Sequence, residues 1–130
     1  MPALAVLLYI LSIMDPLSGF HASHYPLRDE SPIIREGRQY AGWGNWAPDY
    51  MSLDRPYIWR QPWSENDRIV YAACMLSHEA QHVRLRTASE EVPLLYQYVC
   101  LERLGASQGL KDDVYRQLLD LNRVQEGTAE

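Results

Sequence analysis

Apolar residues recur with a helical period between residues 64 and 86, and this is the clearest pattern in the chain. One face of a wheel with 3.6 residues per turn carries Ile69, Ala73, Leu76, Ala80 and Val83, and the first half of the other face carries Tyr71, Cys74 and Met75. Ser64 is a typical N-cap, acidic residues follow it in the first turn, and neither glycine nor proline occurs from residue 65 to residue 86. The pattern predicts a long helix that is buried between two layers of the fold.

Three further helices are predicted. Residues 3–14 are rich in alanine and leucine and follow Pro2, which favours a buried helix over a strand. These twelve residues are too few to span a bilayer, and they lack the basic flank and the small-residue cleavage site of a signal peptide. Residues 90–105 are expected to form a helix that ends at Gly105, and residues 111–123 a third amphipathic helix, followed by a fraying tail at residues 125–130.

Residues 37–63 are aromatic and have the composition of strands and turns. Residues 42–46 contain the glycines and asparagine of a hairpin turn, and residues 56–61 are expected to form a short strand that leads to the long helix. Four tryptophans occur here, and they are equally compatible with lining a groove and with covering the core: Trp43, Trp46, Trp59 and Trp63.

Composition and charge narrow the possible functions. The 130 residues are sufficient for one domain, at residues 1–130, with a modest core. The net charge of −5 gives no electrostatic reason to expect nucleic acid or an anionic membrane as a partner. Cys74 and Cys100 have apolar neighbours and are expected to be buried, unpaired residues, which favours a cytoplasmic over a secreted location. The sequence does not indicate an oligomeric state.

The long helix carries the sequence Ser-His-Glu-Ala-Gln-His at residues 77–82, which is an H-E-x-x-H motif. His78 and His82 are four residues apart, so both imidazoles lie on one helical face and can bind the same Zn²⁺. Glu79 is rotated by about 100° from His78, which favours contact with a zinc-bound water over contact with the metal. The motif is therefore typical of a zinc hydrolase in which Glu79 is the general base.

A catalytic zinc needs a third protein ligand, and no histidine follows His82. Two glutamates begin the next predicted helix, Glu90 and Glu91. The motif together with a glutamate helix that ends in Leu104-Gly105 resembles the gluzincin-type zinc metallopeptidases, in particular the small metallopeptidases of phages and bacteria. The resemblance covers about residues 56–105. It implies His78 and His82 as zinc ligands, Glu79 as base and Glu91 or Glu90 as third ligand, with Glu91 preferred because Leu95 and Tyr98 continue its face.

The resemblance implies an α+β fold, namely a small zincin-like domain with a short antiparallel sheet, the motif helix, the glutamate helix and a C-terminal helix. The expected reaction is peptide hydrolysis on a peptide or protein substrate, with a zinc-bound water as nucleophile. An edge strand would bind the substrate, with residues 57–61 as first choice and residues 45–47 as second. Several residues could stabilise the oxyanion, and the sequence does not choose among Tyr57, Tyr96, Tyr98, His21 and Arg60. The alternative is a non-hydrolytic zinc-binding module with a structural or partner-binding role.

Overall fold

The computed structural model describes the backbone of residues 1–129 and side chains as far as Arg123. Helices and strands follow one another in the order α1 (Leu4–Met14), α2 (Pro16–Ala22), β1 (Leu27–Asp29), β2 (Ile33–Arg35), β3 (Arg38–Tyr40), β4 (Gly42–Asn45), β5 (Tyr50–Leu53), α3 (Arg55–Trp59), α4 (Glu65–Leu85), α5 (Glu91–Arg103) and α6 (Gln108–Ala129). The predicted α+β class is confirmed. Of the predicted tail, the backbone as far as Ala129 belongs to α6, whereas its side chains and Glu130 lie outside the described residues.

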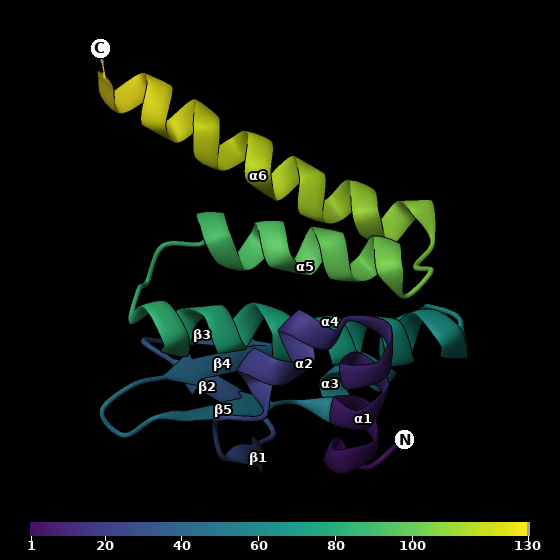
Figure 1. Ribbon diagram of the computed structural model, residues 1–130. Helices are drawn as coiled ribbons and strands as arrows, with labels where there is room; N and C mark the ends of the chain where they lie inside the picture. The colour runs from purple at the N-terminus through teal and green to yellow at the C-terminus, as the bar shows by residue number, and fades with distance from the viewer. Residues whose placement is uncertain (130) are drawn as a thin grey trace.

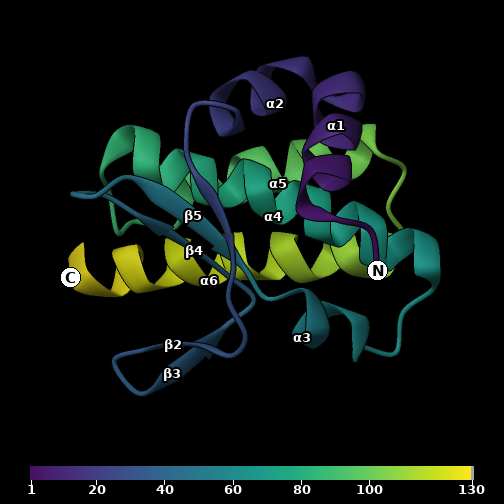
Figure 2. The same cartoon turned by 90° about the horizontal axis from the view of Figure 1, so that it is seen from below.

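Helix α4 is the centre of the fold. In Figure 1, α6, α5 and α4 lie one above another, and the strands lie on the side of α4 away from α5. Figure 2 shows α1 and α2 on one side of α4 and the β2–β3 hairpin on the other. An unbroken run of buried residues from Ala72 to Val83 follows from this central position. The predicted burial between layers is confirmed.

The predicted start of α4 is also confirmed. The Ser64 hydroxyl accepts a hydrogen bond from the backbone N–H of Asp67 at 3.1 Å, which satisfies one of the free donors of the first turn. At the other end Arg86 has a φ of 48°, a left-handed conformation that ends the helix and turns the chain back. Helix α5 therefore packs antiparallel to α4 as a helical hairpin (Figure 1).

The strands differ from the prediction in three respects. The three-stranded sheet has the order β1-β5-β4 and is mixed, since β1 is parallel to β5 and β4 is antiparallel to it. Residues 42–45 form strand β4, and the turn follows that strand. The expected strand at residues 57–61 is wrong, because α3 occupies most of it: Asp54 caps this helix by accepting a hydrogen bond from the N–H of Tyr57 at 3.0 Å, and Pro56 lies in its first turn.

The prediction of unpaired cysteines is wrong. Cys74 of α4 and Cys100 of α5 form a disulfide with their Cα atoms 5.6 Å apart. The two residues meet because the helices are antiparallel neighbours, which the spacing of two isolated cysteines does not reveal. Disulfides persist mainly in oxidising compartments, so the cysteines no longer support a cytoplasmic location.

The first helix is confirmed at Leu4–Met14, and it packs on α2 and α4. It is only half buried, however: Leu7 and Leu11 join the core, whereas Tyr9 and Ile13 are exposed. Within residues 1–129, no helix combines the length and the hydrophobicity required to cross a bilayer.

Candidate metal centre

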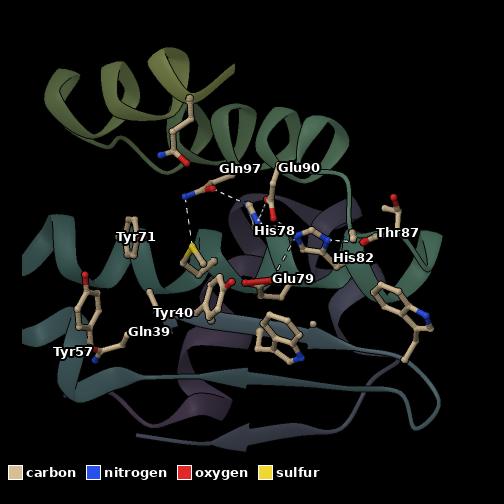
Figure 3. Close-up of a pocket in the computed structure, with 18 of the residues that line it drawn as sticks. Gln39, Tyr40, Tyr57, Tyr71, His78, Glu79, His82, Thr87, Glu90 and Gln97 are labelled. Carbon is tan, nitrogen blue, oxygen red and sulfur yellow. Dashed lines mark hydrogen bonds and ion pairs between the residues drawn. The ribbon is translucent and has the colours of Figure 1, made fainter. Parts of the chain in front are cut away.

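The two histidines of the motif lie one turn apart on α4, and both are buried. Their Nε2 atoms are 3.2 Å apart and point toward the same space between α4 and α5 (Figure 3). The predicted pairing of the imidazoles on one helical face is confirmed.

The second ring nitrogen of each histidine is held by an oxygen. His78 Nδ1 is 2.8 Å from Gln97 Oε1, and His82 Nδ1 is 2.7 Å from the backbone carbonyl of Thr87. A carbonyl oxygen only accepts hydrogen bonds, so each Nδ1 is the donor. With Nδ1 protonated, loss of the Nε2 proton leaves the Nε2 lone pairs directed at the shared space. This orientation is the one in which histidine binds a metal through Nε2.

Glu90 completes the cluster. Its Oε2 is 2.9 Å from His78 Nε2, and its Oε1 is 3.1 Å from His82 Nε2. The preference for Glu91 as third ligand is therefore corrected, because Glu91 is exposed and Glu90 lies against both histidines.

The physical reason is the phase of α5. Its buried face carries Pro93, Leu94, Gln97, Cys100 and Leu101. These positions lie 3, 4, 7, 10 and 11 residues after Glu90, which is the helical repeat of a face that includes Glu90. Leu95, whose supposed burial favoured Glu91, is 48% exposed. Helix α5 begins at Glu91, so Pro93 lies inside its first turn.

The spacing of these three candidate ligand groups is close to that of a tetrahedral zinc site. Bonds of about 2.0–2.1 Å to zinc place neighbouring ligand atoms about 3.3 Å apart. Glu90 Oε2 is 2.9 Å from His78 Nε2, Glu90 Oε1 is 3.1 Å from His82 Nε2, and the two Nε2 atoms are 3.2 Å apart, so a small cation fits among these groups with slight expansion. His78, Glu79 and His82 form another possible trio, with ligand atoms within 4.8 Å of one another. Glu79 is the poorer third ligand, because its Oε1 is 3.9 Å from His82 Nε2.

Glu79 lies beside the histidines, against strand β4 (Figure 3). Two inward-facing glycines of this strand make room for it. A Cβ atom at Gly42 would be 2.8 Å from Glu79 Oε2, and a Cβ at Gly44 would be 2.4 Å from the Glu79 backbone oxygen. Edge strand β4 therefore approaches α4 more closely than any other residue type would allow.

The charges of the cluster are coupled. Burial raises the pKa of Glu79, although the neighbouring histidines pull it down. Partial burial raises the pKa of Glu90, but hydrogen bonds from His78 and His82 outweigh it and lower the value to about 2. Burial has the opposite effect on His82 and lowers its pKa, but Glu90, Glu79 and the Thr87 carbonyl outweigh burial and raise the pKa to about 9. In His78, the nearby carboxylates outweigh burial and raise the pKa. Without a metal, shared protons hold these groups together, and a bound cation would replace them.

A cavity of about 510 Å³ opens in front of the cluster. It lies between α4, α5 and the edge strand β4, and its lining includes both histidines, Glu79 and Glu90. In Figure 3, Tyr57 and Tyr71 lie to one side of the histidine pair and Thr87 to the other. The cluster thus occupies the middle of a cleft.

Some of the remaining residues that the sequence analysis named line the cavity, and the others lie outside it. Tyr57 lines it, and so do Trp43 and Trp46, whereas Trp59 and Trp63 pack against the core. His21 lies away from the cluster, with its Nδ1 3.0 Å from Gln81 Nε2. Tyr96, Tyr98 and Arg60 are not part of the described cavity lining.

Gln97 and Gly42 were not recognised from the sequence. The signal for Gln97 was a single amide in the apolar stripe of residues 93, 94, 97, 100 and 101. The signal for Gly42 was its alternation with Trp43 and Gly44, which is also typical of a turn.

No protein-family model, curated protein or solved structure matches this chain.

Proposed function

We propose that this protein is a zinc-dependent peptidase with His78, His82 and Glu90 as zinc ligands and Glu79 as general base. One observation carries the proposal. The two Nε2 atoms and the Glu90 carboxylate converge at zinc-compatible separations, and each histidine is held through Nδ1 with its Nε2 directed at the shared point. Metal-binding histidines commonly have such an outer hydrogen bond, which fixes the tautomer and the ring plane.

Zinc held by these three residues would supply a Lewis acid that polarises a peptide carbonyl and lowers the pKa of a bound water. Glu79 takes a proton from the attacking water and delivers it to the amine nitrogen. The water oxygen bonds to the carbonyl carbon as the C–N bond breaks, and the products are a carboxylate and a protonated amine that carries both protons of the water. Burial beside Gly42 holds the Glu79 carboxylate at the cluster.

The position of Glu79 favours an enzyme over a structural zinc site. Structural zinc is usually enclosed by four protein ligands, whereas catalytic zinc keeps one position for water. Three candidate ligands converge here, and the Glu79 carboxylate lies farther out, with its Oε1 3.9 Å from His82 Nε2. The cluster also faces a cavity. The second candidate is a non-hydrolytic zinc-binding module, and the experiment below distinguishes it from the peptidase.

Strand β4 supports a peptide as the substrate. It is an edge strand of the sheet, and it borders the cavity through Gly42, Trp43 and Gly44. A free strand edge offers backbone hydrogen bonds to an extended chain, as in binding by strand addition. The second choice from the sequence, residues 45–47, overlaps this strand at Asn45.

The test combines metal analysis with a Glu79→Gln variant. Purified wild-type protein should contain close to one zinc per chain and cleave members of a peptide library. Glu79→Gln should keep the zinc and lose activity by roughly 10²–10⁴-fold, because it loses only the proton acceptor. A protein that takes up no zinc would refute the proposal. A zinc-loaded protein without activity would favour the non-hydrolytic module, and loss of zinc in Glu79→Gln would make Glu79 a ligand.

A further inference from the structure

The cleft continues on both sides of the proposed zinc ligands. Thr87 and Ala88 line it beyond His82, where the chain turns from α4 to α5. Tyr57 lines it on the opposite side of the histidine pair (Figure 3). A chain lying along β4 therefore passes the cluster and has room to continue in both directions. Such a cleft suits cleavage inside a chain better than removal of a terminal residue.

Apart from the three proposed zinc ligands, the charged side chains of the cleft are negative. They are Glu36 and Glu79, and lysine and arginine are absent from the described lining. A carboxylate that is removed from water needs a hydrogen-bonding or cationic partner. An enzyme that removes C-terminal residues therefore needs a cationic side chain that binds the terminal carboxylate. This lining offers no such side chain. Acidic substrate side chains would also meet repulsion from Glu36 at the rim.

The part of the cavity lined by Tyr57, Tyr71 and Met75, the Tyr57–Tyr71–Met75 pocket, is aromatic and apolar. Tyr71 and Met75 are one turn apart on α4, and Tyr57 of α3 lies on the same side of the histidine pair as Tyr71 (Figure 3). All three side chains line the cavity. The Tyr71 ring is packed against Trp63, with ring centroids 4.8 Å apart, which keeps the pocket wall in place. Uncharged glutamines border the same cavity, Gln39 from β3 and Gln117 from α6.

We infer that the cleft binds an internal, extended segment with a large uncharged side chain in the Tyr57–Tyr71–Met75 pocket, and that it rejects acidic side chains there. The inference rests on the proposed peptidase function and specifies its substrate class. It follows from the two-sided shape of the cleft, its acidic lining and the aromatic pocket taken together.

The first experiment uses zinc-loaded wild-type protein and a peptide library that is acetylated at the N-terminus and amidated at the C-terminus. Mass spectrometry should locate cuts inside these blocked peptides, with large uncharged residues enriched beside the cut and aspartate and glutamate depleted. In a cleaved peptide, replacing the enriched residue by glutamate should lower kcat/KM by about ten-fold or more, since a carboxylate would be desolvated without a partner. Cleavage confined to unblocked peptides, or enrichment of acidic residues, would overturn the inference.

The second experiment changes the charge of the cleft. Gln117→Arg and Gln39→Arg each place a cation at its border, and at least one should raise kcat/KM for the glutamate peptide relative to its parent by about ten-fold. The matched control is Gln108→Arg, an exposed glutamine of α6 that is not part of the cavity lining. A failure of both cleft variants, or an equal gain in the control, would contradict the assigned pocket.

A binding measurement separates failure of this inference from failure of the proposed function. Zinc-loaded Glu79→Gln should bind the fluorescent, blocked parent peptide at least about ten-fold more tightly than its glutamate twin, as measured by anisotropy. If wild type cleaves nothing, the peptidase proposal fails, while this ratio still tests the preference of the cleft. Equal affinities, or no binding of either peptide, would refute the inference.

Discussion

Replacing Gln97 by leucine tests whether the proposed metal site depends on the orientation of His78. Gln97 is 4% exposed, and its Oε1 accepts from His78 Nδ1 at 2.8 Å while its Nε2 donates toward Met75 Sδ at 3.5 Å. Leucine is similar in size but accepts no hydrogen bond. The buried Nδ1–H would lose its partner, which costs about 1–3 kcal/mol, and the ring would be free to exchange tautomers.

Zinc affinity should therefore fall by about 10- to 100-fold, the usual effect of removing such an outer hydrogen bond. That range corresponds to about 1.4–2.7 kcal/mol and agrees with the cost of the orphaned donor. Competition with a chromogenic chelator measures the affinity, and a thermal melt in excess zinc verifies that the variant is folded. Gln97→Glu keeps an acceptor and should retain at least wild-type zinc affinity.

The matched control is Gln81→Leu. Gln81 is fully buried on α4, and it bonds to His21 and Arg84 away from the cluster. It should lose stability and keep its zinc affinity. If Gln97→Leu binds zinc as tightly as wild type, or if both variants lose zinc equally, the role of Gln97 in holding His78 is refuted.

Further predictions address the third ligand, the proton acceptor and the metal-free cluster. Glu90→Gln should weaken zinc binding by about ten-fold or more in the chelator assay, whereas Glu91→Gln should leave the affinity unchanged. The reverse result would mean that α5 turns a different face toward α4 in solution. Gly42→Ala should lower kcat with zinc content unchanged, because the new Cβ would be 2.8 Å from Glu79 Oε2 and must displace that carboxylate. Activity equal to that of wild type would show that the strand moves without disturbing Glu79. In zinc-free protein, ionised Glu90 stabilises the fold at pH values above its ordinary pKa of 4.5, and this stabilisation is lost as the pH falls toward 2. Protonated His82 stabilises the fold at pH values below its ordinary pKa of 6.5, and this stabilisation is lost as the pH rises toward 9. The melting-temperature difference between wild type and Glu90→Gln should accordingly be largest between about pH 4.5 and 6.5, and a difference that does not change with pH would exclude this ion pairing.

Helix α4 and the pairing of its histidines were predictable because both depend on neighbours in sequence. The cap at Ser64, the helical period of the apolar residues and the four-residue spacing of His78 and His82 act within a few turns of one helix. Helix α1 was predictable for the same reason, from local propensity.

The strands were harder to predict, since a strand is stabilised by a partner that lies elsewhere in the chain. Gly42 and Gly44 resemble turn residues when considered alone. They form strand β4 because β5 pairs with it and because α4 approaches too closely for any side chain. The sequence at Tyr57 contained a local signal that was missed, since Asp54 and Pro56 are typical of a helix start.

Which of the two candidate glutamates faces the histidines was decided only by the tertiary structure. Sequence reasoning reduced the choice to Glu90 and Glu91, which are adjacent and identical in chemistry. One residue corresponds to about 100° around a helix, so the phase of α5 against α4 determines which carboxylate faces the histidines. That phase follows from the left-handed turn at Arg86 and from the packing of α5 through Leu94, Gln97 and Cys100. The same packing brings Cys100 to Cys74 and Gln97 to His78, contacts between distant residues that exist only once the two helices are side by side.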